Sequence, residues 1–241
     1  MQMTGQSESG AGGNLTGMLT ASEQAEEMIQ GAMGAEPSMG GGAAMADTER
    51  AEYISEGFPI GSLPIPPPDA GGDTDAGVAS MALFLDKLSE RLAFERTGTR
   101  LYDGLINKCQ TLAPDASDPS LDDLQEIRDE EHQHFMMLTE AITQVGGDPT
   151  VQSPCADVVG VASMGLMQVI MDPRTSVSQS LQAILTAELT DNAGWEMLAE
   201  LAGELGYSDL NEQFEEALEA EERHLMNVQT WLKDMVMAKA A

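Results

Sequence analysis

The chain has 241 residues, 42% of them hydrophobic, and its 41 acidic against 11 basic side chains give a formal net charge of −30. This length fits one large domain, or one domain with an extension, and the apolar content is enough for a sizeable core. The charge argues against nucleic acid as a partner. The negative charge is typical of an acidic, solvent-exposed surface suited to high salt. It could also create an electrostatic field that concentrates cations near a metal site, and the two interpretations are compatible.

Two further features bear on the cellular compartment. The sequence has no run of 18 apolar residues, and its N-terminus has no basic segment followed by a continuous apolar one, so we expect no membrane span and no secretory signal. The two cysteines, Cys109 and Cys155, form no C-x-x-C motif. We therefore expect neither a disulfide nor a zinc knuckle, and a reducing, cytoplasmic location.

Residues 1–78 differ in composition from the rest of the chain: they are rich in Gly, Ala, Ser, Met and Pro. Such a segment is expected to be extended or disordered on its own. One short helix is predicted after the capping-box pattern Thr20–Glu23, ending near Gly34 and Pro37. Its apolar face would hold Ala25, Met28, Ile29 and Ala32. The segment Phe58–Pro68 is typical of a stiff polyproline-type strap. The arm is either a dispensable tail or a segment that docks on its own or a neighbouring subunit.

Residues 79–241 carry a strong helical pattern, which predicts four long helices and one short one. The first long helix is expected from Ala79 to Leu112. The second would begin at Asp118-Pro119, with proline at the first helical position, and stop at Gly146-Gly147. A long connection follows, with a short helix over 156–171 that breaks at Asp172-Pro173. The remaining signals are a cap at Ser176 with Gln179, a stop at Gly206 and a cap at Ser208.

Each long helix has an apolar stripe at helical spacing that is interrupted by a glutamate. The stripes are Phe84, Leu88, Leu92, Glu95, Tyr102 and Ile106; Leu124, Ile127, Glu131, His134, Leu138 and Ile142; Leu181, Ile184, Glu188, Asp191, Trp195 and Leu198; and Phe214, Ala217, Glu221, His224, Val228 and Trp231. A carboxylate that faces a core must be neutralised, paired or bound to a cation. The stripes hold too few lysines and arginines for four carboxylates, so we expect a metal cluster.

Two of these stripes contain the motif Glu-x-x-His, at Glu131–His134 and again 90 residues later at Glu221–His224. Residues i and i+3 lie on one helix face, so both side chains can bind one ion. Single glutamates precede the motifs at Glu95 and Glu188, 93 residues apart. The chain has three histidines, and two of them complete such pairs. A chance match in glutamate-rich helices is the competing interpretation.

The neighbours of these residues have simpler interpretations. His132 falls on the outer face of its helix and is expected to be an exposed bystander. Asp191 follows Glu188 by one turn, and either accepts a hydrogen bond from a histidine ring or pairs with a nearby arginine. Tyr102 is interpreted as core rather than as a redox tyrosine, and Trp195 as packing. The glutamates expected on the solvated surface are Glu126, Glu130, Glu219 and Glu222.

Single glutamates on the first and third helices, with Glu-x-x-His on the second and fourth, resemble the ferritin-like di-iron carboxylate superfamily. The resemblance covers about residues 79–238 and implies an all-α, antiparallel four-helix bundle with a long crossover between helices two and three. The irregular N-terminal arm matches no motif of the family. The metal ligands that the resemblance implies are Glu95, Glu131, His134, Glu188, Glu221 and His224, with Glu131 and Glu221 bridging.

The repeat is similar to the rubrerythrin-like and bacterioferritin-like branches. Two cysteines cannot supply the four-cysteine iron site of a rubredoxin module, so an external electron donor is implied. Carboxylate and imidazole ligands suit two iron ions, with manganese as the alternative. The family's activities are Fe(II) oxidation with O₂ or peroxide, peroxide reduction and dimanganese catalase chemistry.

A second hypothesis comes from another class: a structural or assembly protein, in which the metal staples the core and the arm links subunits. An exchangeable metal position would distinguish an enzyme from this building block. A homo-oligomer is expected under either hypothesis. A mineral-storing cage is less favoured, because the arm has no counterpart in cage-forming ferritins.

Overall fold

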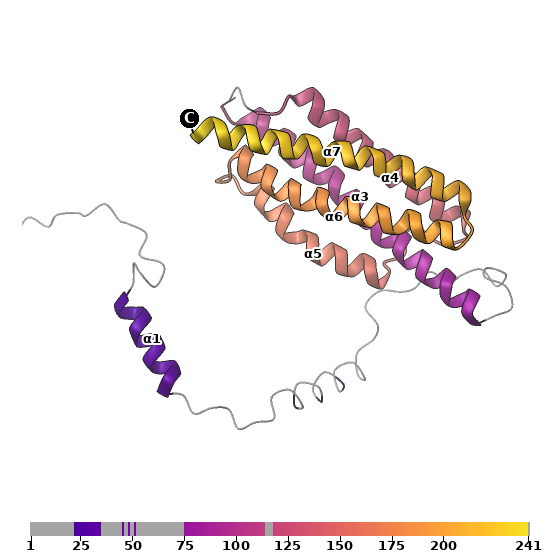
Figure 1. The fold of residues 1–241 in the computed structure, drawn as a ribbon, viewed down its shortest axis with the longest axis horizontal. Coiled ribbons are helices and arrows are strands. Elements are labelled where there is room, and N and C mark those ends of the chain that lie inside the picture. The colour runs from indigo at the N-terminus through magenta and orange to yellow at the C-terminus, as the bar shows by residue number, and fades with distance from the viewer. Residues whose placement is uncertain are drawn as a thin grey trace, which may run out of the picture. The chain divides into compact units, whose positions relative to one another are not determined.

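The computed structural model describes residues 22–34, 45, 48, 51, 75–113 and 118–240, and the chain divides into two compact units, Met1–Phe58 and Pro59–Ala241. In the first unit, α1 spans Ser22–Gly34 (Figure 1), so a helix that ends at Gly34 is confirmed. The capping pattern from Thr20, most of the apolar face of α1 and the strap Phe58–Pro68 lie outside what is described. The domain boundary after residue 78 stays a prediction.

Every regular element in the described part of the second unit is a helix. Its helices are α3 (Asp75–Thr111), α4 (Leu121–Gln144), α5 (Pro154–Met171), α6 (Val177–Glu204) and α7 (Ser208–Ala240). The four long helices and the short one between the second and third were all predicted. Helix α3 begins four residues before the predicted start, and α5 two residues before.

The helix starts show which capping signals were interpreted correctly. The side chain of Ser176 accepts from the backbone N–H of Gln179, and the Gln179 side chain caps Ser176 in return, so the predicted capping box is confirmed. The predicted start at Asp118-Pro119 is wrong. Ser120 caps α4 by accepting from the backbone N–H of Asp123, and a serine hydroxyl can satisfy a free N–H that proline cannot.

The helix ends follow the glycines. Gly146 and Gly206 have positive φ angles, 83° and 81°, which only glycine adopts without strain. Beyond Gly206, the N–H of Tyr207 donates to the carbonyl of Ala202 at 2.9 Å and closes the turn. Ser208 is the first helical residue of α7 rather than its cap, one position from the prediction.

The helices of this unit pack around two apolar clusters. Helix α3 contacts α4, α5 and α6, while α7 contacts α6 and α4. Figure 1 shows α5 returning the chain from the end of α4 to the start of α6. One cluster includes Phe84, Trp195 and Phe214. The other includes Tyr102 and Val228. Along each long helix, the residues of the two clusters lie before and after the predicted ligands, with Phe94 on α3 as the exception. The ligands therefore form a polar layer between the two clusters.

Helix α5 is unusually apolar. Among the described helices it alone is long and apolar enough to cross a membrane, by length and composition, with a mean hydropathy of 1.5 over 18 residues. Core helices of soluble proteins meet the same criterion, and α5 packs against α3 and α6. The expectation of no membrane span therefore stays a prediction. Its exposed apolar side chains are Val158, Val161, Met164, Val169 and Met171.

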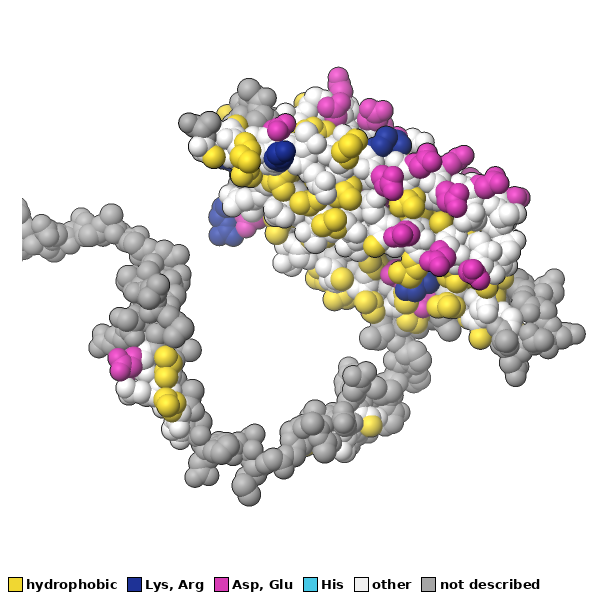
Figure 2. Space-filling model, in the orientation of Figure 1, with side chains coloured by type: hydrophobic (Ala, Val, Ile, Leu, Met, Phe, Trp, Pro, Cys, Tyr) yellow, Lys and Arg dark blue, Asp and Glu magenta, His cyan; other side chains and the backbone are white. Residues whose placement is uncertain are grey.

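The charge of the chain lies largely on its surface. Figure 2 shows acidic side chains spread over the visible face of the helical unit, with few lysines or arginines among them. Solvated carboxylates of this kind need no partner. The buried ones do, and among the described residues all of them except Asp86 gather in a single layer.

Candidate metal centre

All six predicted ligands lie in this buried layer, contributed by four helices. Their exposed fractions range from 0% to 6%. They are Glu95 on α3, Glu131 and His134 on α4, Glu188 on α6, and Glu221 and His224 on α7. The structure therefore brings together side chains that are up to 129 positions apart in the chain.

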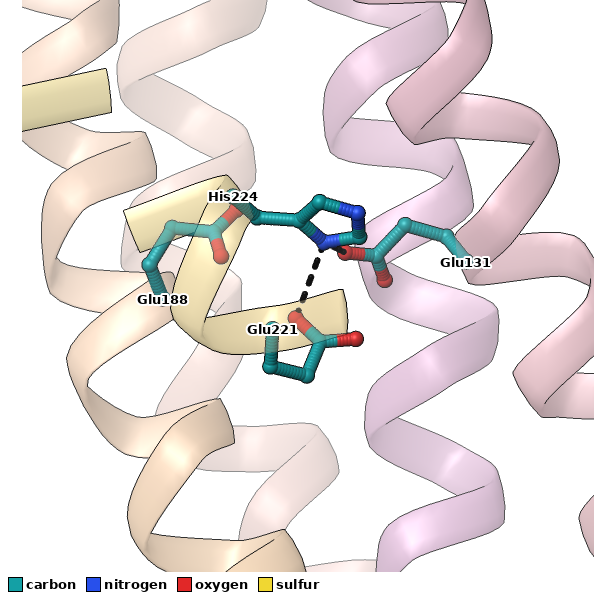
Figure 3. Close-up of side chains that lie close together, drawn as sticks. All are labelled: Glu131, Glu188, Glu221 and His224. Carbon is teal, nitrogen blue, oxygen red and sulfur yellow. Dashed lines mark hydrogen bonds and ion pairs between the residues drawn. The ribbon is translucent and has the colours of Figure 1, made fainter. Parts of the chain in front are cut away.

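The first cluster consists of Glu131, Glu188, Glu221 and His224. One ligand atom from each of the four lies within 4.8 Å of the others. Figure 3 shows the three carboxylates converging around the ring of His224. The Nδ1 atom of His224 lies 3.0 Å from Oε2 of Glu221 and 3.8 Å from Oε1 of Glu131. This spacing leaves a position for one ion among four donors.

A second cluster lies beside the first and shares Glu221 with it. It consists of Glu95, His134 and Glu221, again within 4.8 Å. The Nδ1 atom of His134 lies 2.7 Å from Oε1 of Glu221 and 3.7 Å from Oε2 of Glu95. Glu221 thus offers one oxygen to each histidine, which is the geometry of a carboxylate between two cation positions.

The carboxylates of the layer lack enough donors. Burial raises the pKa of Glu131 well above its usual value, and the charges of Glu221 and Glu95 add to the effect. Burial also raises the pKa of Glu188 to about 8, with Glu221 contributing. One oxygen on each of three glutamates accepts no hydrogen bond from any described residue: Glu95 Oε2, Glu131 Oε2 and Glu188 Oε2. On Glu221, Oε1 is paired with the ring nitrogen of His134 at 2.7 Å. Unpaired buried oxygens are costly, and cations in the two positions would satisfy them.

Residues 86–238 match the family model for Ferritin, a ferritin-like domain. The chain belongs to the ferritin-like superfamily. The match covers more than half of the sequence and includes all six candidate ligands. Comparisons with curated proteins and with solved structures found no match. The buried carboxylate and histidine clusters of this ferritin-like domain could hold a metal.

Without metal, the carboxylates of the centre favour the protonated form of the two candidate ligand histidines, His134 and His224. Burial alone would lower the pKa of His134, but contacts with Glu221 and Glu95 outweigh it and raise the value to about 10. The same competition, with Glu221 as the main partner, raises the pKa of His224 to about 9. Burial opposes ionisation of Glu221, yet the two histidines lower its pKa to about 2. Protonated imidazoles therefore supply part of the positive charge that metal ions would bring.

Two aromatic side chains of the domain donate hydrogen bonds to the centre. The indole N–H of Trp195 on α6 donates to Oε1 of Glu95 on α3, at 2.9 Å. The hydroxyl of Tyr102 on α3 donates to Oε1 of Glu188 on α6. Both side chains lie in the core, as expected, but their hydrogen bonds to the glutamates had not been predicted. A buried Tyr or Trp usually places its polar atom on a partner, and here the partners are the two single glutamates.

Glu130 is a second correction, because it does not lie free on the solvated surface. Its Oε2 lies 2.6 Å from Nε2 of His224, and its Oε1 accepts from Arg223 at 3.0 Å. A carboxylate on the outer nitrogen of a ligand histidine fixes the orientation of the ring. Helical spacing within α4 could not reveal this contact, because it depends on the approach of α7. Exposure is as predicted for Glu126, Glu219, Glu222 and His132.

The alternatives for Asp191 are resolved by Arg91. Nη2 of Arg91 lies 2.9 Å from Oδ1 of Asp191, and its Nε lies 3.2 Å from Oε1 of Glu95. Of the two partners considered for Asp191, the arginine is confirmed. Arg91 was not predicted to belong to the centre, although it precedes Glu95 by one helical turn.

A glycine on α3 makes room for one of the ligands. A Cβ atom on Gly98 would lie 1.9 Å from Oε2 of Glu131. That oxygen accepts no hydrogen bond within the described part of the chain, so it is free to bind a cation. The absence of a side chain at Gly98 therefore lets the Glu131 carboxylate take its place between the helices.

Proposed function

We propose that the six residues bind two iron ions, with manganese as the alternative, and that the protein is an oxidoreductase that oxidises Fe(II) with O₂ or peroxide. The observation that carries this proposal is the convergence of four glutamates and two histidines in one buried layer. Carboxylate oxygens in this layer lack a hydrogen-bond donor among the described residues. The accompanying fold would be an antiparallel four-helix bundle of α3, α4, α6 and α7, with α5 as the crossover.

The donor set favours these metals. Carboxylate-rich sites with imidazole suit iron and manganese, whereas zinc sites more often include thiolates or more histidines. Both cysteines are free thiols and neither belongs to the clusters. In the proposed arrangement, Glu188 and His224 would hold one ion, Glu95 and His134 would hold the other, and Glu131 and Glu221 would contribute to both, as the resemblance implies.

Two bound Fe(II) ions would supply two electrons, which with two protons reduce one peroxide to two waters. The chain's own residues then have defined tasks. The carboxylates hold the ions, and the apolar clusters on both sides keep bulk water from the layer. Tyr102 and Trp195 fix the carboxylates of Glu188 and Glu95. Repeated turnover would require an external electron donor, and a reducing cytoplasm is the compartment we propose.

The burial of the centre favours a second candidate, a structural or assembly protein. No candidate ligand is more than 6% exposed, which suits a closed structural site as well as one reached only by small oxidants. In this case the metal would stabilise the core of the domain by linking its helices. Under either function we propose a homo-oligomer, with the N-terminal arm linking the subunits.

Oxidation kinetics separate these candidates. Fe(II) is added anaerobically at about two per chain, the number that the ligand pattern implies, and O₂ or peroxide is then admitted in a stopped-flow mixer. We expect rapid oxidation by the wild type and a collapse of the rate in Glu95→Ala, Glu188→Ala and His224→Ala. His132→Ala is the matched control, because its ring is exposed. Oxidation no faster than that of free iron in the same buffer would favour the structural function.

A further inference from the structure

Arg91 is a buried cation in direct contact with the centre, although it is not one of the six candidate ligands. Its side chain is only 6% exposed. Ion pairs with Asp191 and Glu95 hold it at 2.9 Å and 3.2 Å, and Nη1 also donates to the main-chain oxygen of Asp191 at 3.4 Å. The guanidinium lies over the ring of Phe94, 4.3 Å from its centroid. These contacts fix the charge in one place.

The neighbouring helix leaves space for this guanidinium. A Cβ atom on Gly194 would lie 1.8 Å from Nη1 of Arg91. Any larger residue at position 194 would push the arginine out of its position. Arg91 is therefore accommodated by the backbone of α6 as well as by its carboxylate partners.

Three carboxylates define the position that Arg91 approaches. Glu95, Glu131 and Asp191 each bring one oxygen within 4.8 Å of the others, as in the two proposed metal positions. All three side chains are at most 2% exposed. One oxygen of Glu131 accepts no hydrogen bond among the described residues. The layer thus contains a third cluster suited to a cation, and Arg91 already contacts two of its members.

The third cluster has no counterpart in the other half of the repeat. The offset of 93 residues that relates Glu95 to Glu188 places Ile184 opposite Arg91 and Gly98 opposite Asp191. The second half therefore has no arginine at the position equivalent to Arg91, and the first half has no aspartate at the position equivalent to Asp191. The ion pair between them occurs once, between the two halves.

A charge balance of the layer indicates that Arg91 compensates one of its carboxylates. Four glutamates and Asp191 bring five negative charges, two divalent ions bring four positive charges, and ligand imidazoles are neutral. One positive charge is missing, and an uncompensated buried charge is costly. We propose that Arg91 is the resident cation of a third position formed by Glu95, Glu131 and Asp191, and that it limits the centre to two metal ions. This inference rests on the proposed binding of two ions.

Metal stoichiometry tests the inference. The full chain is loaded anaerobically with excess Mn(II), freed of unbound metal by gel filtration and analysed for manganese per chain. We expect two ions in the wild type and three in Arg91→Gln, because the third position is then vacant and its carboxylates are unpaired. Arg91→Lys keeps the charge and should bind two. The double variant Arg91→Gln, Asp191→Asn removes one charge of each sign and should also bind two.

Arg96→Gln is the matched control, because Arg96 is exposed on the same helix and its loss should leave two ions. Two ions in both the wild type and Arg91→Gln would overturn the inference and leave the proposed function intact. A wild type without metal would instead contradict the proposed function. If Arg91→Gln does not fold, anomalous diffraction from wild-type crystals grown with Co(II) decides. A metal peak beside Asp191 would overturn the inference, and peaks only in the other two positions would support it.

Discussion

Trp195 on α6 donates its indole N–H to Oε1 of Glu95 on α3 at 2.9 Å, so a residue of one half of the repeat holds a glutamate of the other. The reverse contact is also present, because Tyr102 on α3 donates to Glu188 on α6. Each donor follows the glutamate of its own helix by seven residues. The two contacts therefore cross between α3 and α6 and orient both single glutamates towards the centre.

Replacing these donors should weaken metal binding without destroying the centre. We expect Trp195→Phe and Tyr102→Phe each to lower the affinity for Mn(II) by about 10-fold, the lower end of the effect seen when partners of metal ligands are removed. The measurement is an anaerobic titration followed by calorimetry. Trp231→Phe is the control, since Trp231 packs at the edge of an apolar cluster away from the ligands. Equal affinities in all three variants would show that the crossed contacts do not position the carboxylates.

A substitution at Gly98 tests the position of Glu131 by steric exclusion rather than by a change of charge. In Gly98→Ala the new Cβ would lie 1.9 Å from Oε2 of Glu131, so this carboxylate must move and metal content should fall. Gly160→Ala on α5 is the matched control, because nothing lies within 4 Å of its added Cβ. That change should leave metal content intact and stabilise the helix by up to about 1 kcal/mol. Metal analysis and thermal melting report both effects, and full metal content in Gly98→Ala would contradict the position assigned to Glu131.

The stability of the metal-free protein should fall as the pH rises from 4.5 to about 10. The folded-state pKa of Glu188 is raised to about 8, and those of His224 and His134 to about 9 and about 10. The folded centre therefore binds protons that the unfolded chain releases. The contribution of Glu188 is complete below its usual pKa of 4.5 and is lost as the pH rises through 8. The histidine contributions are complete below 6.5 and are lost through 9 to 10. Glu221, with its pKa lowered to about 2, acts in the opposite sense, and only below 4.5.

Metal should remove this pH dependence, because bound cations take the place of the protons. Free metal at a thousand times its dissociation constant would stabilise the domain by about 4 kcal/mol. For a chain of this size, that raises Tm by roughly 8–16 °C. Thermal melts at several pH values should show the gap between loaded and metal-free protein widening with pH, and further at low salt. A gap that is constant or absent would contradict the crowding of carboxylates in the centre.

The helices and the candidate ligands could be predicted because both depend on the spacing of residues along a single helix. Helical periodicity placed the buried stripes of α4 and α6 correctly, including Glu131 and Glu188. Glu130, Arg91 and the donor role of Tyr102 could not be predicted in the same way. Their contacts reach residues 94, 100 and 86 positions away, so they depend on how the helices approach one another. At the edges of the stripes, Ile106 and Trp231 are only partly buried.

Removing the N-terminal arm should leave the metal centre intact. All candidate ligands and the start of α3 at Asp75 lie beyond a deletion of residues 1–70, so the shortened chain should fold and bind metal. If the arm links subunits, the deletion should lower the oligomeric state. Light scattering with parallel metal analysis measures both properties. Unchanged mass would make the arm a dispensable tail, and loss of metal would contradict the independence of the helical domain.

The central claim is that four glutamates and two histidines on α3, α4, α6 and α7 bind two metal ions. The most direct measurement is anaerobic reconstitution of the wild type with Fe(II), followed by metal analysis, with Glu131→Ala and Glu222→Ala treated in parallel. We expect about two ions per chain, as for other centres with this ligand pattern. We also expect loss of metal in Glu131→Ala and full content in Glu222→Ala, because the first side chain is buried among the ligands and the second is exposed. A wild type without iron, or equal metal in the two variants, would contradict the central claim.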